Sequence, residues 1–363
     1  MRLVINLSMV GKNPTGLGVY SLSCAKVAAR FETSIIRTQS LQYVGRTAIE
    51  APSGIDIGGG KLAALKRQVW MRRLRFPDDS LVYSPTHHGL PNQPGQIITI
   101  HDMICLRFPH QHFPQYIFFK YFIPRLLKRC RAVFTVSETT RRDIIRTYGY
   151  PAERIRVVPN SVDTNCFMTG EVDRRNPYLL MVGARYPHKN VDEVLRNAHL
   201  WKDRYRLVVT SCSSSYRATL ESLIDQLRIR HRVEFRGYVS RDELLRLYQG
   251  CSALVYPSKW EGFGIPPLEA FACSRPVIAS DIEIHREVLG DAAIFVQLGD
   301  KRSWCSAFEA LQDTPRIDEY VLRGRVQVDR YSPRNALDAL EASLLAVEPR
   351  LESSLSVAQN RIP

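Results

Sequence analysis

Apolar and polar positions along this chain follow two alternating patterns. Short apolar runs of three to five residues alternate with longer stretches in which apolar residues recur at helical spacing. Buried strands separated by amphipathic helices are typical of a parallel sheet with crossover helices, so the pattern predicts an α/β protein. The predicted strands are residues 3–6, 81–83, 97–100, 132–136 and 155–158 in the first half and 178–182, 206–210, 233–235, 253–256, 277–279 and 293–296 in the second.

A break in this pattern divides the chain into two Rossmann-like domains. Residues 163–177 combine Gly, Pro, Asn and clustered charges without periodicity, which predicts a linker. We therefore expect an N-terminal domain at residues 1–165 and a C-terminal domain at residues 176–330. The predicted helices include residues 217–229, residues 241–249 and a final helix within residues 331–349, followed by a frayed tail.

Composition agrees with two folded domains and places the charge in one of them. The chain has 363 residues, about twice an ordinary domain, and its 45% hydrophobic and 24% charged residues are close to globular averages. The net charge is +14, but residues 1–175 carry 25 Lys and Arg against 12 Asp and Glu, whereas the remainder carries 25 against 24. The basic character therefore belongs to the N-terminal half.

Two basic runs concentrate this charge. Residues 57–77 hold six basic residues and no acid, and residues 120–131 interleave bases with Phe, Tyr and Leu. Basic amphipathic stretches bind anionic membranes at least as readily as nucleic acid, and a solvated helix face is the other interpretation. We predict an anionic membrane surface and no nucleic acid as the partner, with contacts from Lys66, Arg67, Arg72 and Arg73.

The sequence shows no pattern of a disulfide framework, a metal centre or a membrane span. Its eight cysteines are scattered without a C-x-x-C pair, no D-x-D motif occurs, and no window approaches 18 uncharged apolar residues. We therefore expect reduced thiols, no metal and no resident cofactor. The expected location is cytoplasmic and peripheral, at the inner face of the plasma membrane.

Two candidate sites follow strands of the N-terminal half. Gly16 and Gly18 lie in a loop between the first strand and a helix, where backbone N–H groups and the helix dipole can meet a phosphate. The spacing fits neither G-x-G-x-x-G nor the P-loop, so a plain turn is the alternative. His101 and Asp102 directly follow the strand at 97–100, and such positions line the ligand crevice of an open parallel sheet. A loop histidine with satisfied hydrogen bonds is the alternative there.

A third candidate site follows the strand at residues 178–182. Arg185 and Lys189 stand four residues apart beside a predicted helix start. A guanidinium fork and an ammonium point charge, supported by a helix dipole, suit a diphosphate. An exposed basic turn is the other interpretation.

The fourth candidate site is the stretch 260–273. Glu261 and Glu269 bracket a glycine-containing loop and the first turn of a helix that Pro266 or Pro267 would open. On that helix Glu269 could accept two hydroxyls of a ribose, and Glu261 would lie on the loop over the crevice. Acids near a helix N-terminus are also favoured by the dipole alone.

Together these residues resemble a known family. Gly16 and Gly18, the pair at 101–102, and residues 158–163, 182–190 and 261–269 are similar to the retaining glycosyltransferase family 4 ("glycosyl transferases group 1"), which contains bacterial mannosyl- and rhamnosyltransferases of surface-polysaccharide assembly. The resemblance covers residues 1 to about 345. It implies the GT-B fold, in which two facing Rossmann-like domains leave a crevice between them and the final helix crosses back to the first domain. Ser161 and Ala184 depart from the commonest family wording.

The resemblance also implies roles for individual residues. His101 and Glu261 would be the catalytic groups that orient and stabilise the transferring sugar. The loop at Gly16 and Gly18 would close against the donor phosphate. The remaining implied donor contacts are Arg185 and Lys189 for the diphosphate, Glu269 for the ribose, and the backbone at Phe263, Gly264 and Ile265 for the sugar and phosphates.

The implied reaction is transfer of a hexose with retention, without a metal ion. A nucleotide-diphosphate sugar is the co-substrate, with GDP-mannose or a related GDP-deoxyhexose favoured and a UDP-sugar as the alternative. The acceptor would be a hydroxyl of a glycan or of a lipid-linked oligosaccharide. A nicotinamide-dependent oxidoreductase lacks its dinucleotide fingerprint here, and a nucleic-acid-binding protein lacks a recognised motif.

Overall fold

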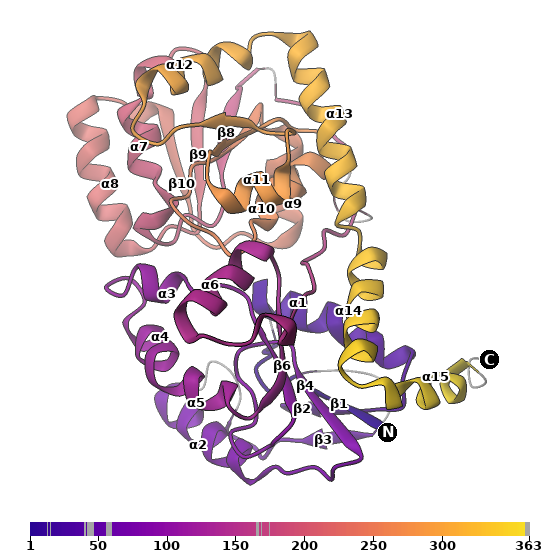
Figure 1. Ribbon diagram of the computed structural model, residues 1–363. Coiled ribbons are helices and arrows are strands. Elements are labelled where there is room, and N and C mark those ends of the chain that lie inside the picture. Colours follow the sequence, from indigo (N-terminus) through magenta and orange to yellow (C-terminus); the bar gives the residue numbers. More distant parts are fainter. Residues whose placement is uncertain are drawn as a thin grey trace. The chain divides into compact units, whose positions relative to one another are not determined.

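The computed structural model describes residues 1–359 apart from residues 13, 15, 40, 42–46, 56–59, 165, 166, 168 and 174. The described chain forms two compact units (Figure 1). Unit 1 contains Met1–Asn160 together with the segment that begins at Pro333, and unit 2 contains Ser161–Ser332.

Unit 1 is built on a seven-stranded parallel sheet with the order β3-β2-β1-β4-β5-β6-β7. The chain order reverses between β1 and β4, so the carboxyl ends of these two strands form the position at which Rossmann-like sheets bind ligands. The strands are β1 (Arg2–Asn6), β2 (Thr33–Arg37), β3 (Ala48–Glu50), β4 (Ser80–Ser84), β5 (Gln96–Ile100), β6 (Cys130–Thr135) and β7 (Ile155–Val157).

Unit 2 has a six-stranded parallel sheet with the order β10-β9-β8-β11-β12-β13. Here the order reverses between β8 and β11, whose residues are all buried because helices cover a parallel sheet on both faces. The strands are β8 (Tyr178–Met181), β9 (Arg206–Thr210), β10 (Val233–Arg236), β11 (Ala253–Tyr256), β12 (Val277–Ser280) and β13 (Ile294–Val296).

The predicted fold class is confirmed, since both units are α/β with Rossmann-like parallel sheets. All eleven predicted strands are present, with ends within two residues of the expected ones. The predicted strands did not include β2 and β3, and the prediction was wrong there. β2 opens with the polar pair Thr33 and Ser34, which the fold buries, and β3 has only three residues, so neither forms an apolar run.

Helices connect the strands in both units (Figure 1). Ser240 caps the predicted helix α9, because its Oγ accepts a hydrogen bond of 3.2 Å from the backbone N–H of Glu243. The helices of unit 1 are α1 (Gly16–Ala25), η1 (Lys26–Ala29), α2 (Gly60–Arg73), α3 (Ile104–Arg107), α4 (Phe113–Ile117), the π-helix η2 (Phe118–Phe122), α5 (Ile123–Leu127), α6 (Glu138–Tyr148), η3 (Ala152–Arg154), α14 (Pro333–Val347), η7 (Pro349–Leu351) and α15 (Glu352–Gln359). Those of unit 2 are η4 (Pro187–Lys189), α7 (Val191–Arg196), η5 (Ala198–Leu200), α8 (Ser214–Leu227), η6 (Arg230–Arg232), α9 (Arg241–Gly250), α10 (Ile265–Ala272), α11 (Glu283–Leu289), α12 (Lys301–Ala310) and α13 (Thr314–Arg330). Among the described residues no helix is both long and apolar enough to cross a bilayer.

Helix α10, which carries Glu269, is fixed in place by close packing on α13. A Cβ atom added at Gly324 of α13 would lie 2.6 Å from the ring of Phe271 on α10. Only glycine therefore allows the two helices to approach this closely. Phe271 itself is fully buried, so α10 has little freedom to shift.

The boundary between the units differs slightly from the predicted one. The division falls between Asn160 and Ser161, whereas the predicted first domain ends at residue 165. The backbone N–H of Val162 donates a hydrogen bond of 3.0 Å to the carbonyl of Tyr331, which ties this part of the chain to unit 2.

The C-terminal segment belongs to unit 1. Helix α14 packs against α1, η1 and β7. Arg30, the C-cap residue of η1, forms ion pairs with Asp338 and Glu341 of α14. For η7 and the start of α15 the expectation of a frayed tail beyond Glu348 was wrong, because Leu351 is fully buried and Ser354 is 3% exposed. Burial of Leu351 in η7, and a hydrogen bond of 2.6 Å that the Ser354 hydroxyl donates to the Leu351 carbonyl, hold this part of the tail. Residues 360–363 of this tail lie outside the described residues.

Glu348 links the segment to the sheet of unit 1. Its buried carboxylate accepts hydrogen bonds from Arg350 and from Arg131 of β6. The bond from Arg350, and next the bond from Arg131, lower the pKa of Glu348 to about 2 against the opposing effect of burial.

Replacing Glu348 by Gln should lower the free energy of unfolding at pH 7 by about 1.5–3 kcal/mol, the range for hydrogen bonds to charged groups. A carboxyl whose pKa falls on folding stabilises the protein above its ordinary pKa of 4.5, and this contribution is lost as the pH falls toward 2. Urea unfolding between pH 7 and pH 3 should show the difference between the two proteins shrinking below about pH 4.5. Glu319→Gln, which breaks an exposed pair with Arg323, is the matched control and should change little. Equal effects of both substitutions would contradict the buried link.

Candidate functional site

The strongest site candidate in unit 2 lies where the strand order reverses. The loop after β8 carries Arg185 and Lys189, and the loop after β11 carries Glu261. Since β8 and β11 are adjacent and parallel, the two loops leave the same edge of the sheet side by side. The topology therefore brings together two motifs that are distant in the sequence.

Lys189 and Glu261 form an ion pair at this edge. The Lys189 Nζ lies 2.5 Å from the Glu261 Oε1, and the two side chains are only 17% and 8% exposed. The ammonium also donates to the Tyr256 hydroxyl at 3.3 Å and lies 5.2 Å from the centre of that ring. An ammonium held between a carboxylate and a phenol is oriented before any ligand arrives.

The pair keeps Glu261 ionised despite its burial. Burial alone raises the pKa of this carboxyl, but the Lys189 charge and its hydrogen bond outweigh burial, so the pKa of Glu261 is lowered. At neutral pH the site therefore holds a buried carboxylate and an ammonium, with a net charge close to zero.

Glu269 is in a different electrostatic environment. Its Oε2 accepts a hydrogen bond of 2.6 Å from the hydroxyl of Tyr248, a fully buried residue of α9. Burial raises the pKa of Glu269 more than this hydrogen bond lowers it, so the net shift is upward. The surroundings thus shift the pKa values of the two carboxyls of the motif in opposite directions. Such a difference is found in sites that use two carboxyls for different roles.

The loop between these carboxyls has a backbone that only glycine readily adopts. Gly264 has a φ of 93° and is the N-cap of α10, which begins at Ile265. Pro266 and Pro267 follow and carry no N–H, so the first turn presents few donors. The ring of Phe263 packs edge-on to Tyr331 at 5.1 Å, and the residue as a whole is 4% exposed.

His285 of α11 lies against the same loop and was not among the predicted site residues. Its ring centre is 5.3 Å from that of Tyr256, and a Cβ on Gly264 would lie 3.9 Å from its Nε2. Burial lowers the pKa of His285 to about 4, so the ring is neutral. Its Nδ1 lies 2.9 Å from the Ser280 carbonyl and must carry the hydrogen, which leaves a buried Nε2 without a partner among the described residues. No motif in the sequence marks this histidine.

Arg185 lies outside the ion pair. Its side chain is exposed, and the guanidinium lies 5.6 Å from the ring centre of Tyr186. The structure therefore pairs Lys189 with Glu261, whereas Arg185, the second predicted phosphate ligand, lies at the surface.

His101 of unit 1 lies at the carboxyl end of β5. It is 8% exposed, and its ring meets the edge of Tyr20 from α1 at 4.5 Å. Burial lowers the pKa of His101 to about 4, and its Nε2 lies 3.0 Å from the carbonyl of Pro85. Because a carbonyl only accepts, the neutral ring carries its hydrogen on Nε2.

The predicted glycine loop opens α1 in the same unit. A Cβ on Gly18 would lie 2.8 Å from the Cβ of Pro14, whereas Gly16 is exposed with nothing within 4 Å of such an atom. Residues 13 and 15 of the predicted loop lie outside the described residues. Gly18 is thus required by packing, and Gly16 is open to the surface.

The predicted membrane contacts need one correction. Lys66, Arg72 and Arg73 of α2 are exposed, but Arg67 is 7% exposed and donates a hydrogen bond of 2.8 Å to the carbonyl of Ile55. Arg67 faces inward on the helix and cannot contact a membrane. Residues 57–59, the start of the predicted basic run, lie outside the described residues.

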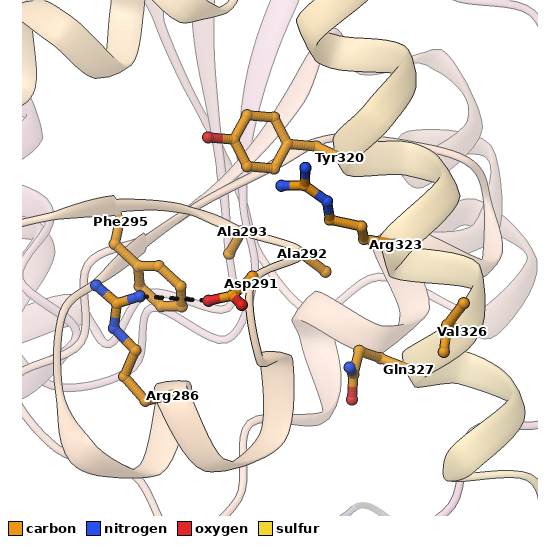
Figure 2. A pocket seen from close by; sticks show the side chains of 9 residues that line it. All are labelled: Arg286, Asp291, Ala292, Ala293, Phe295, Tyr320, Arg323, Val326 and Gln327. Atoms are coloured by element: carbon orange, nitrogen blue, oxygen red, sulfur yellow. Dashed lines mark ion pairs between the residues drawn. The ribbon is translucent and has the colours of Figure 1, made fainter.

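A pocket of about 760 Å³ lies elsewhere on unit 2 (Figure 2). It is lined by α11, β13 and α13, where the guanidinium of Arg286 stacks on Phe295 at 3.8 Å and lies 3.9 Å from Asp291. None of the predicted site residues lines it. In the part of the chain that the structure describes, no cluster of three or more His, Cys, Asp and Glu side chains could hold a metal ion.

Comparisons with known proteins agree on one family. The family described as "Glycosyl transferases group 1" matches residues 169–314, and "Glycosyltransferase Family 4" matches residues 81–165. The O-antigen chain mannosyltransferase RfbU of Salmonella typhimurium is 34% identical over 88% of this chain and 95% of its own length. O-antigen chain mannosyltransferase B of Escherichia coli is 28% identical over 74% of each chain.

Solved structures show the same fold. The Anabaena protein HepE in complex with UDP and glucose aligns with a TM-score of 0.72 at 16% identity, over 95% of this chain and all of that one. Sucrose-phosphate synthase from Thermosynechococcus elongatus aligns with a TM-score of 0.73 at 16% identity, over 96% of this chain and 99% of that one. These likenesses confirm the predicted GT-B class.

The ion pair predicts non-additive losses of stability. Replacing Lys189 by Met should cost about 3–5 kcal/mol at pH 7, because it leaves the Glu261 charge buried and unpaired. Adding Glu261→Gln should recover part of this loss. Lysine removal raises the pKa of Glu261, so the penalty in the single variant should fall as the pH is lowered and the carboxyl protonates. Urea unfolding of Lys189→Met, Glu261→Gln and the double variant at pH 7 and pH 5 measures both effects, and additive losses would contradict a coupled pair.

Proposed function

This chain belongs to the glycosyltransferase family described as Glycosyl transferases group 1, and from that premise we propose that it is a retaining, metal-independent hexosyltransferase of surface-polysaccharide synthesis. The donor is a nucleotide-diphosphate sugar. The acceptor is a hydroxyl of a glycan or of a lipid-linked oligosaccharide.

The observation that carries this proposal is the Lys189–Glu261 ion pair at the strand-order reversal of unit 2. A ligand at this edge would meet an oriented ammonium, an ionised carboxylate and the backbone of the loop at Gly264. A diphosphate pairs with the ammonium, and sugar hydroxyls pair with carboxylate oxygens. The same edge thus suits both parts of a nucleotide-diphosphate sugar.

The charges suggest how the donor would react. Lys189 and the exposed Arg185 would stabilise the charge on the departing diphosphate without a bound cation. Glu261 stays ionised and would stabilise an oxocarbenium-like sugar electrostatically, while the departing phosphate accepts the acceptor proton from the same face. His101 is neutral at physiological pH and would contact the sugar as a hydrogen-bonding group rather than as a charge.

Mannose is the favoured sugar and GDP the favoured nucleotide. Two relatives carry the name O-antigen chain mannosyltransferase, and one of them matches nearly its whole length. A UDP-sugar is the second candidate, because HepE binds UDP and glucose. Glu269, held by Tyr248 at the base of α10, is the proposed ribose ligand in either case.

The proposed location is the cytoplasmic face of an anionic membrane, where the protein is peripheral. Exposed Lys66, Arg72 and Arg73 lie on one helix of unit 1 and can each contribute about 1 kcal/mol near such a surface. No nucleic-acid partner is proposed.

A panel of nucleotides tests the donor site. GDP and GDP-mannose should raise the thermal unfolding temperature more than UDP and UDP-glucose, because a ligand that binds only the folded state stabilises it. Arg185→Ala should weaken binding of the best nucleotide by about 1.5–3 kcal/mol, the range for a hydrogen bond to a charged group. Arg204→Ala, which removes another exposed arginine of unit 2, is the control and should bind as the parent does. Unchanged affinity in Arg185→Ala would remove this residue from the site.

Chelation tests metal independence. Transfer should persist in excess EDTA, because the proposed counter-charges are those of Lys189 and Arg185. The measurement is initial rate with and without EDTA, with added Mg²⁺ and Mn²⁺ as controls. Complete loss on chelation, restored by either ion, would contradict the proposed mechanism.

A further inference from the structure

The pocket of about 760 Å³ in Figure 2 is a hollow of unit 2 that the proposed reaction does not use. It lies between α13 on one side and α11, β13 and the loop that joins them on the other. Lys189, Glu261 and Glu269 do not line it. A ligand in this pocket would therefore bind apart from the donor residues of the same unit.

The guanidinium of Arg286 is fixed at one side of the pocket by two neighbours. Its Nε and Nη2 donate to the two carboxylate oxygens of Asp281 at 2.6 and 2.8 Å, and its central carbon lies 3.8 Å from the centre of the Phe295 ring. The hydrogen bonds from Arg286 lower the pKa of Asp281, so that carboxylate stays ionised. Asp291 is 90% exposed and lies 3.9 Å from Arg286, which is beyond hydrogen-bond distance. The carboxylate of Asp291 is thus open to the donors of a ligand.

The charges around the pocket already balance one another. Arg323, which lines the opposite side, pairs with Glu319 at 3.0 Å. Two guanidinium groups, those of Arg286 and Arg323, therefore stand beside three carboxylates, those of Asp281, Asp291 and Glu319. A phosphate would meet at least as much negative as positive charge here, so the pocket does not favour an anion.

The lining combines flat polar groups with apolar surface. Tyr320 and Phe295 are half-buried, and Val326 is 62% exposed. Guanidinium, carboxylate and amide groups can each hydrogen-bond two neighbouring hydroxyls, and an aromatic ring packs on apolar C–H groups. A sugar ring has both neighbouring hydroxyls and C–H faces. The lining therefore suits a neutral ligand made of sugar rings.

Gln327 adds an acceptor that has no partner. Its Oε1 is buried and forms no hydrogen bond among the described residues. The amide packs against the end of α11, since a Cβ atom added at Gly290 would lie 3.0 Å from its Nε2. A buried acceptor costs free energy until a donor reaches it. Because the terminal torsion of glutamine is broad, this oxygen can turn toward a hydroxyl in the pocket.

We propose that this pocket binds a neutral segment of a glycan chain, with sugar hydroxyls on Asp291, Arg323 and Gln327 and a C–H face of a sugar ring on Tyr320. The inference goes beyond the proposed function, which needs only the donor sugar and one acceptor hydroxyl to be bound. A second contact with the glycan raises the effective concentration of the acceptor at the enzyme. This role, but not the binding itself, rests on the proposed function.

Calorimetry with the full-length chain tests the pocket, with mannotriose, maltotriose and cellotriose as probes. One of them should bind about 10-fold or more tightly than its own monosaccharide, because a chain segment covers more of the lining than one sugar does. Hydrogen–deuterium exchange at residues 286–295 and 320–327 should slow when this trisaccharide is added. Displacement by inorganic phosphate would identify an anion site and overturn the proposal.

Two variants connect the binding to named residues. Arg323→Ala should weaken trisaccharide binding about 10-fold, whereas Arg316→Ala, which removes another exposed arginine of α13, is the matched control and should bind as the parent does. Gln327→Leu removes an unpaired buried oxygen, so it should keep or raise the thermal unfolding temperature while it weakens trisaccharide binding. Parent-like binding by Arg323→Ala or by Gln327→Leu, or no binding of any of the three trisaccharides, would overturn the proposal.

Nucleotide binding separates failure of this inference from failure of the proposed function. Arg323→Ala should bind the donor nucleotide as the parent does, because Lys189 and Glu261 are not part of the pocket. If a trisaccharide binds and no nucleotide does, the proposed function fails and the glycan pocket stands. Competition between the trisaccharide and the nucleotide would assign the sugar to the donor site and overturn the inference.

Discussion

The ion pair between Lys189 and Glu261 is the constraint on which the candidate site depends. Removing two charges from water costs several kcal/mol each, and this cost is recovered only when geometry and hydrogen bonds are good. The pair joins the loop after β8 to the loop after β11, and Tyr256 fixes the ammonium from a third direction. The proposed binding of a diphosphate and a sugar next to each other needs such a fixed arrangement before the ligand arrives.

The two units supply different kinds of chemistry. Unit 2 offers fixed charges, because its two carboxyls have pKa values shifted in opposite directions by Lys189 and by burial. Unit 1 offers neutral imidazoles, because burial lowers the pKa of His88 and of His101 to about 4. Charged groups suit the departing diphosphate, whereas neutral donors and acceptors suit sugar hydroxyls.

The sequence predicts local structure and single site residues, but not the partners that they make in space. Unbroken apolar runs identify β8 and β11. In contrast, β2 opens with two polar residues that are buried, so it does not form such a run. Lys189 and Glu261 each stand out in a local motif, but they are 72 residues apart, and only the strand order joins them. His285 and Tyr248 lie in no local motif. Arg67 points inward because of the way α2 packs, which the sequence does not show.

Hydrogen–deuterium exchange with and without the donor sugar nucleotide tests the central claim most directly, because it reports where the nucleotide binds. The account predicts slower exchange of backbone amides at residues 183–190 and 261–269, with the region around residues 286–295 and 320–327 unchanged. Slower exchange confined to that second region, which lines the pocket of Figure 2, or no change in unit 2 at all, would contradict a donor site built on the Lys189–Glu261 pair.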